Sequence, residues 1–498
     1  MPRRRASRTG FAVFLAAAAL VAPRGAPTAS PSELVAPPLR PEGRWLVDAT
    51  GRVVLMHGLQ IARKTAPYFP PVADFDERDA DLIKSLGINA VRLAWFWKGL
   101  EPNRGEFDDS YLEHVTRVGD LLASRGIFLL VESHQDLFGE QVRGSGFPDW
   151  ATRTDGVPAG PDAGFPFSYV TSPALNRAFD NLYADTDGIA GAYAKAWQHV
   201  AAAFASQPMV LGYDLFNEPW PGSSYPTCAN FAGCPVFDSN LLQPLQDRLA
   251  FGVRDADPRA IVFYEPHPFF NYGARSHLAP PPQASGPSGL SFHAYCLAAG
   301  AHYRPDDESG SVGYPTCPVA DDLVFQNALE TGEQMGVPPL FSEFGDTQDL
   351  ALIERYIQLA DKYMTGWMFW GYKDWVDVPG GAGDGALFDD SSDFGSLRQE
   401  KADVVSRTHP MAVAGIPIGY RFDPTTAEFS MEYQPRPTLD DASTVIFVPV
   451  DRHYPQGYQV SVEGAQVTSS PCSTYLTLKN NPGVDAVSVA VRPGGECE

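Results

Sequence analysis

The chain alternates between short apolar, often β-branched runs and longer segments in which apolar residues recur every three or four positions. The short runs predict buried strands and the longer segments predict amphipathic helices. Strands are expected at 52–60, 89–95, 127–134, 210–217, 260–265, 289–295, 339–344 and 366–374. Helical patterns lie between them at 76–86, 110–125, 187–206, 240–254, 321–335 and 349–364. This order predicts an α/β fold, a (β/α)8 TIM barrel with parallel strands.

An open, doubly wound parallel sheet is the alternative arrangement of the same elements. That fold usually carries a glycine-rich phosphate-binding turn after its first strand. No such turn follows residues 52–60. The closed barrel is therefore the favoured prediction.

The periodicity changes near residue 405. From about 415 to 495 short alternating runs are separated by turns rich in Gly, Pro and Asn, which predicts an antiparallel β-sandwich domain. We expect a barrel over residues 30–410 and a β-sandwich over 411–498. The aromatic residues of the second domain are expected to be core, with a sugar or lipid platform as the alternative: Tyr420, Phe422, Phe429, Tyr433, Tyr454 and Tyr458.

Residues 1–29 have the pattern of a secretory signal peptide. Arg3, Arg4, Arg5 and Arg8 precede an apolar run at 10–21, and small residues follow around 22–30, where cleavage is expected. The run is short for a membrane-spanning helix, so an uncleaved anchor is the weaker alternative. The sequence therefore predicts a secreted protein.

The cysteines agree with export, because disulfides persist in oxidising compartments. Short loops close most easily, so the expected pairs are Cys228–Cys234, Cys296–Cys317 and Cys472–Cys497. The spacing of cysteines and histidines fits no metal-ligand pattern, so we expect no metal, and nothing indicates a cofactor. The formal net charge of −23, with 60 acidic against 37 basic residues, argues against nucleic-acid binding.

Two glutamates follow strand-like runs at the fourth and seventh predicted strands. Glu218 lies in LGYDLFNEPW and Glu343 in PLFSEFG. Barrel active sites are built at the C-terminal ends of the strands, so both carboxyls are expected in one mouth. Paired carboxyls suit glycoside hydrolysis, in which one protonates the leaving oxygen and the other attacks the anomeric carbon. Either glutamate alone is more simply a salt-bridge partner or helix cap.

The two motifs resemble those of glycoside hydrolase family 5. The resemblance implies that Glu218 is the acid/base, that Glu343 is the nucleophile and that Arg92 orients the nucleophile. It also implies a sugar subsite lined by polar and aromatic residues at other strand ends: His134, Asn217, Tyr295 and Trp370, with His293 beside them.

A narrower resemblance, to the endoglycoceramidase group, covers nearly the whole chain after the signal. It rests on the runs HGLQIARKTAPYFP, ESHQDLFGEQVRGSGFPDWAT, FHAYCL and WMFWGYKDW. It implies a retaining endo-β-glycosidase that hydrolyses the glycan–ceramide bond of glycosphingolipids, with Lys64, His134 and Asp136 on the reducing-end sugar. Transient contact with a lipid surface or micelle is then expected.

Other substrates remain open from the sequence. The alternatives are an endogalactosylceramidase, a glucocerebrosidase-type β-glycosidase, a family 5 hydrolase of a soluble β-glycan, and a non-catalytic sugar-binding barrel. Apolar side chains in the long loops wall a groove for lipid chains or pack the loops onto the barrel: Phe147, Trp150, Phe269, Phe270 and Leu387.

Overall fold

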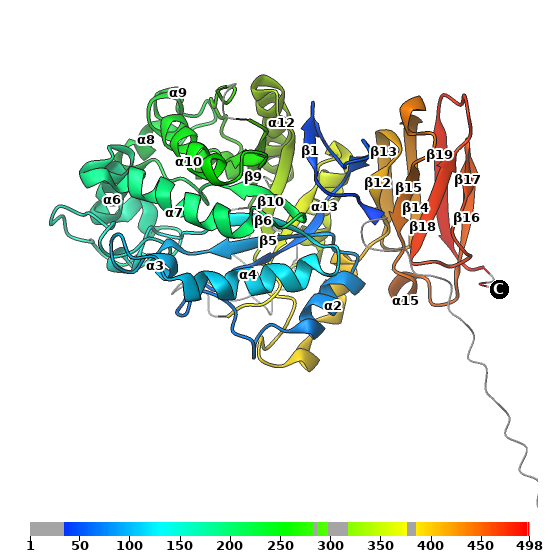
Figure 1. The fold of residues 1–498 in the computed structure, drawn as a ribbon, viewed down its shortest axis with the longest axis horizontal. Helices are drawn as coiled ribbons and strands as arrows, with labels where there is room; N and C mark the ends of the chain where they lie inside the picture. The colour runs from blue at the N-terminus through cyan, green and yellow to red at the C-terminus, as the bar shows by residue number, and fades with distance from the viewer. Residues whose placement is uncertain (1–33, 283–285, 297–316, 376–384, 496, 498) are drawn as a thin grey trace, which may run out of the picture.

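The computed structural model describes residues 34–282, 286–296, 317–375, 385–495 and 497 (Figure 1). The expected signal segment, residues 1–29, lies outside these residues. None of the described helices is both long enough and apolar enough to cross a membrane.

Eight parallel strands close into a barrel, which confirms the predicted fold and excludes the open sheet. Around the barrel their order is β10, β11, β4, β5, β6, β7, β8 and β9. The strands are β4 His57–Ile61, β5 Ala90–Trp95, β6 Phe128–Ser133, β7 Val210–Asp214, β8 Val262–Tyr264, β9 Ser288–His293, β10 Pro339–Gly345 and β11 Trp367–Trp370.

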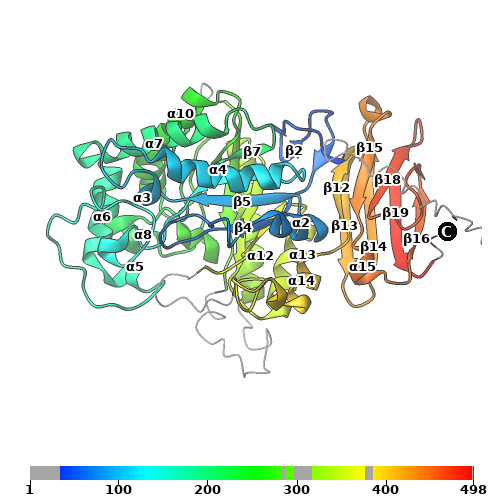
Figure 2. The same ribbon diagram turned by 60° about the horizontal axis from the view of Figure 1, so that its bottom comes forward.

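Helices surround this barrel (Figures 1 and 2). The longer ones are α2 Glu77–Ser85, α4 Asp109–Ala123, α6 Pro173–Tyr183, α7 Ile189–Phe204, α10 Gln243–Ala256, α12 Cys317–Met335 and α13 Leu350–Tyr363. Aspartates begin several of them, as Asp108 does for α4, because a side-chain oxygen accepts a free N–H of the first turn. The large core between strands and helices includes Trp95, Trp197 and Trp367, all fully buried.

The connection between β8 and β9 differs from the helical connections because its described part contains no α-helix. Its described part holds a 3-10 helix at Pro268–Tyr272 and chain without regular secondary structure. This loop enters the barrel mouth.

Antiparallel strands form a β-sandwich, as predicted, but the N-terminal segment contributes to it. One sheet contains β1 Arg40–Glu42, β2 Trp45–Val47, β3 Val53–Val54, β12 His409–Val413, β15 Ser443–Phe447, β18 Tyr475–Asn480 and β17 Ala465–Val467. The other contains β13 Gly415–Asp423, β14 Glu428–Pro435, β19 Val487–Pro493 and β16 Tyr458–Glu463.

The predicted first strand, 52–60, is therefore two strands. Val53 and Val54 pair with β2 and β12 in the sandwich, and the barrel strand begins at His57. The sandwich is consequently not confined to residues 411–498. The six aromatic residues of this domain named above are all buried in its core, which leaves no aromatic platform among them.

The sandwich packs against the end of the barrel at which the strands begin (Figure 1). One apolar cluster joins Met56, Phe128 and Met368 of the barrel to Met411 and Phe447 of the sandwich. The Leu55 N–H donates to the carbonyl of Met411 just before β4. The mouth, where the strands end, therefore lies on the opposite side from the sandwich.

Candidate active site

Nine of the ten predicted site residues lie near or just beyond the C-terminal ends of barrel strands, and Arg92 lies inside its strand. Lys64 follows β4, Arg92 is in β5, His134 and Asp136 follow β6, Asn217 and Glu218 follow β7, His293 ends β9, Tyr295 follows it, Glu343 is in β10 and Trp370 ends β11. Hydrogen bonds, ion pairs and ring contacts link them into one cluster, described below.

Glu218 and Glu343 face each other across the mouth. One carboxylate oxygen of each, together with a nitrogen of His293, lies within 4.8 Å of the others. Retaining glycosidases place their carboxyl groups roughly 5–5.5 Å apart, and inverting enzymes place them about 6.5–9.5 Å apart to admit a water. The observed approach belongs to the closer class.

Both carboxyl groups accept hydrogen bonds from neighbouring side chains. Glu343 accepts hydrogen bonds from Arg92 Nη1 and from the Tyr295 hydroxyl, each at 2.8 Å. Glu218 Oε1 accepts from Asn271 Nδ2 at 2.7 Å and lies 3.1 Å from His293 Nδ1. Each acid therefore has a fixed orientation, with Glu343 held through both of its oxygens.

The electrostatic environments of Glu218 and its neighbours differ. Burial, reinforced by the charge of Asp136, raises the pKa of Glu218 to about 7. Burial lowers the pKa of His293 to about 4, so the ring beside Glu218 is neutral near pH 7. Glu218 thus retains a proton near neutrality, as a general acid requires.

Arg92 is fully buried at the centre of the cluster. Besides Glu343, its guanidinium donates to Asp214 at 2.9 Å and to Asn217 Oδ1 at 3.0 Å. Glu132 and Glu265 lie 3.7 and 3.6 Å away. Asn217 also donates to the carbonyl of Gln135 at 3.0 Å, so its amide is oriented from both ends.

A second group lies beside the carboxyl pair. His134 contacts Glu132 at 2.8 Å and Asp136 at 3.1 Å, and Lys64 pairs with Asp136 at 2.9 Å. Burial alone would lower the pKa of His134, but the two carboxylates outweigh it and raise this pKa to about 9. The ring of Trp370 stacks on that of His134, and Lys64 Nζ lies 4.2 Å from the centre of the Trp370 ring. Charged donors beside an aromatic face suit a sugar ring.

Several residues of this cluster were not predicted from the sequence: Gln60, Glu132, Gln135, Asp214, Glu265 and Asn271. Charged residues within apolar strand runs, as in LLVES and LGYDLF, are a signal that points to Glu132 and Asp214. Asn271 has no such signal, because only the fold brings its loop to Glu218.

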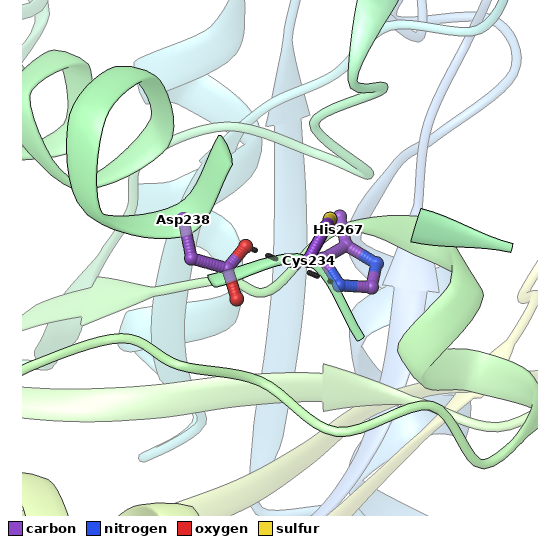
Figure 3. A group of neighbouring side chains, drawn as sticks. All are labelled: Cys234, Asp238 and His267. Carbon is purple, nitrogen blue, oxygen red and sulfur yellow. Dashed lines mark ion pairs between the residues drawn. The ribbon is translucent and has the colours of Figure 1, made fainter. Parts of the chain in front are cut away.

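The disulfides pair as predicted: Cys228–Cys234, Cys296–Cys317 and Cys472–Cys497. Cys234 also lies beside Asp238 and His267, a group with the spacing of metal ligands (Figure 3). Its sulfur is bonded to Cys228, which leaves one carboxylate and one imidazole. Zinc sites in proteins use three or four protein ligands, so this pair falls short of one.

Comparison with known protein families gives matches over both the barrel and the sandwich. Residues 47–375 match the family cellulase (glycosyl hydrolase family 5), and residues 407–491 match the glycoside hydrolase family 5 C-terminal domain. The chain is 33% identical to endoglycoceramidase I of Rhodococcus hoagii (strain 103S), over 92% of this chain and 88% of that protein.

Solved structures of endo-glycoceramidase II from Rhodococcus sp. are also similar. Its ganglioside GM3 complex is 27% identical, with a TM-score of 0.74 over 91% of this chain and 100% of that one. Its lactosyl-enzyme intermediate is 26% identical, with a TM-score of 0.72 over 90% and 99%. Since the family match spans both the barrel and the sandwich, the chain belongs to glycoside hydrolase family 5.

Proposed function

We propose that this protein is a secreted retaining endo-β-glycosidase that hydrolyses the bond between the glycan and the ceramide of glycosphingolipids. The close approach of Glu218 and Glu343 carries the chemistry. Similarity to endoglycoceramidase I over 92% of the chain supports the substrate class.

The first half-reaction forms a glycosyl-enzyme. The ionised Glu343 attacks the anomeric carbon while Glu218 gives its proton to the glycosidic oxygen, so ceramide leaves as a neutral alcohol. Arg92 and Tyr295 hold the Glu343 carboxylate in place for the attack. Glu218, with its pKa near 7, has a proton to give.

The second half-reaction releases the glycan. Glu218, now ionised, takes a proton from water, whose oxygen attacks the same carbon and displaces Glu343. Two inversions give net retention, so the glycan is released as its β-anomer. Formation of a lactosyl-enzyme by the similar endo-glycoceramidase II supports this two-step course.

Product analysis tests the proposal. Thin-layer chromatography of several glycosphingolipids in detergent should show ceramide and an intact glycan appearing together, and Glu343→Gln should abolish both. Early-time NMR should show the β-anomer first. Release of single sugars, an initial α-anomer, or faster hydrolysis of cello- or manno-oligosaccharides would contradict it.

Lipid contact is proposed for one side of the mouth. The described loops and short helices after β6 and β7 carry exposed apolar side chains, among them Phe167, Phe231 and Val236, at 57%, 69% and 71%. Phe147, Phe270 and Leu387 are buried in the barrel core, so they form no groove, and Trp150 and Phe269 are half-buried against it. Exposed apolar patches mark surfaces that meet apolar partners.

This contact is tested separately from catalysis. Phe231→Ser combined with Val236→Ser should slow hydrolysis of glycolipid in neutral vesicles severalfold and leave a soluble aryl glycoside unaffected. Ile418→Ser, at an exposed apolar position of the sandwich, is the matched control. Equal losses on both substrates would contradict the proposed contact.

Secretion is proposed from the N-terminal pattern and is supported by the three disulfides. N-terminal sequencing of exported protein should find a start within residues 22–31. An intact N-terminus on cell-retained protein would contradict it.

A further inference from the structure

Glu265 is the first residue after β8, and its side chain is almost completely buried. One side chain of α10 fixes its backbone. Gln246 Oε1 accepts the Glu265 N–H and Gln246 Nε2 donates to the Glu265 carbonyl, both at 2.8 Å. The position of Glu265 is therefore fixed by the barrel wall.

The carboxyl group of Glu265 reaches across to the end of the neighbouring strand β7. Its Oε1 accepts the backbone N–H of Glu218 at 2.7 Å. Glu218 has a φ of 47°, in the left-handed region that non-glycine residues rarely occupy. A backbone in this region persists only where its surroundings hold it.

The opposite side of the same backbone is held by Gln135. Its Nε2 donates to the carbonyls of Asn217 at 2.8 Å and of Glu218 at 3.1 Å. The N–H of Glu218 and the carbonyls around it thus have separate fixed partners. Removing the acceptor on Glu265 leaves a buried N–H unpaired and frees the peptide to rotate.

Glu265 also borders the groups that surround the two glutamates. Its Oε1 lies 3.7 Å from His293 Nε2, and its Oε2 lies 3.6 Å from Arg92 Nη2. Neither Glu265 Oε2 nor His293 Nε2 has a hydrogen-bond partner among the described residues. The hydrogen bond that the Glu265 side chain accepts therefore comes from the backbone N–H of Glu218.

We infer that Glu265 is a positioning residue for the acid/base, holding the Glu218 backbone in the left-handed conformation that directs its carboxyl toward the glycosidic oxygen. The inference rests on the proposed function in assigning the acid/base role to Glu218. It assigns Glu265 no contact with substrate. Nucleophilic attack by Glu343 does not depend on it.

This separation of roles gives a distinctive kinetic test. A positioned acid matters for a poor leaving group and matters little for a good one, which departs without protonation. General acid catalysis contributes about 100- to 10,000-fold. Two aryl β-glycosides of one sugar, with phenyl and 2,4-dinitrophenyl leaving groups, therefore report on Glu218 whether or not the natural substrate is a lipid.

The variants are Glu265→Leu, which removes the acceptor at similar volume, and Glu265→Gln, which keeps an oxygen acceptor. Glu265→Leu should lower kcat/KM at least about 100-fold on the phenyl glycoside and less than about tenfold on the dinitrophenyl glycoside. Glu265→Gln should lose less than about tenfold on both. If Glu265→Leu does not fold, Gln246→Leu should show a weaker form of the same pattern.

Two further variants separate the explanations. Asp321→Asn removes another buried carboxyl, on α12, where it pairs with Arg355 of α13 and contacts none of the site residues named above, and it should affect both substrates equally. Glu218→Gln should itself lose far more activity on the phenyl glycoside than on the dinitrophenyl glycoside. If it does not, both the acid/base assignment of Glu218 and the role of Glu265 are wrong. Equal losses on both glycosides for Glu265→Leu, or equal damage from Leu and Gln, would overturn the role of Glu265 alone.

Discussion

Burial and charge together determine the pKa values of Glu218 and Glu265, the carboxyls near Arg92 with a raised pKa. Arg92, Lys64 and the protonated His134 are the nearby cations, and they pair with carboxylates throughout the cluster: Glu132, Asp136, Asp214 and Glu343. The pKa of Glu218 is raised by burial and then by Asp136, and that of Glu265 by burial and then by Asp214. For both groups burial therefore outweighs the attraction of the nearby Arg92 guanidinium.

The pH dependence of activity should report Glu218. Its protonated form is the competent acid, so kcat/KM on a poor leaving group should fall as pH rises through about 7. A series of kcat/KM measurements on the phenyl glycoside at different pH values records this fall, the alkaline limb of the pH profile. Glu218→Gln assayed on the dinitrophenyl glycoside should lack it. A limb that persists in this variant would assign the titration to another group.

Asn271 should influence the pH at which this alkaline fall in kcat/KM occurs. Its amide donates to Glu218 Oε1 at 2.7 Å and so stabilises the ionised carboxylate. Asn271→Ala should raise the pKa of Glu218 and move the alkaline limb upward by about one unit. The same pH series measures the shift. An unchanged limb, or one moved to lower pH, would show that this hydrogen bond does not favour ionisation.

Residues at the ends of strands were accessible to sequence reasoning, because alternation of apolar runs and helices fixes where strands end. Glu218, Glu343 and the residues grouped with them follow such runs. Buried partners such as Glu132 and Glu265 were overlooked, since a carboxylate in a strand has meaning only when Arg92 or the Glu218 backbone is seen beside it.

The segment after β9 is tied to the start of α12 by the Cys296–Cys317 disulfide. Tyr295, whose hydroxyl donates to Glu343, is the residue before this bridge. The disulfide thus restrains a residue that orients the proposed nucleophile, and the Cys472–Cys497 disulfide, closing a loop of similar length in the sandwich, has no such neighbour.

Replacing each pair with serine should separate stability from catalysis. Either double variant should lower the free energy of unfolding by about 2–4 kcal/mol, measured by urea unfolding. Cys296→Ser with Cys317→Ser should also lower kcat about tenfold, because Tyr295 loses its fixed position. Cys472→Ser with Cys497→Ser should leave kcat unchanged. Equal kcat in the two variants would remove the catalytic role of the first bridge.

Periodicity predicted the barrel elements well and the N-terminal strands poorly. A strand of two residues, such as β3, has no periodicity of its own, and it merged with β4 in the apolar run RVVLMHGLQ. Its partners in β12 are more than 350 residues away in the chain, so local pattern carries no information about the pairing.

Two histidines join the barrel to the sandwich. The ring of His57 in β4 stacks on that of His409 in β12, with centroids 3.6 Å apart, and both side chains are buried. Burial lowers the pKa of His409 to about 3 and that of His57 well below its ordinary value. Folding therefore requires both rings to remain neutral.

Acid should weaken this junction. The unfolded chain takes up protons near pH 6.5 and the folded His409 only near 3, so stability should fall as pH decreases between these values. The loss is about 1.4 kcal/mol per pH unit for each histidine. His409→Phe keeps a ring against His57 and should lose less stability between pH 7 and 4.5, measured by urea unfolding.

The control for this prediction is Phe429→Leu, which replaces a buried ring of the sandwich core that takes up no proton. It should leave the pH dependence of unfolding as it is in the parent protein. Identical pH slopes for the His409 variant and the parent would show that the junction does not titrate.

Because the sandwich covers the end of the barrel opposite the mouth, Cys497, which is disulfide-bonded to Cys472 of the sandwich, lies away from Glu218 and Glu343. A chain anchored through the C-terminus to a bead or electrode would present its mouth outward. Immobilised molecules would then share one orientation toward whatever flows past. A substrate dispersed in particles too large to diffuse between crowded proteins would still reach every mouth.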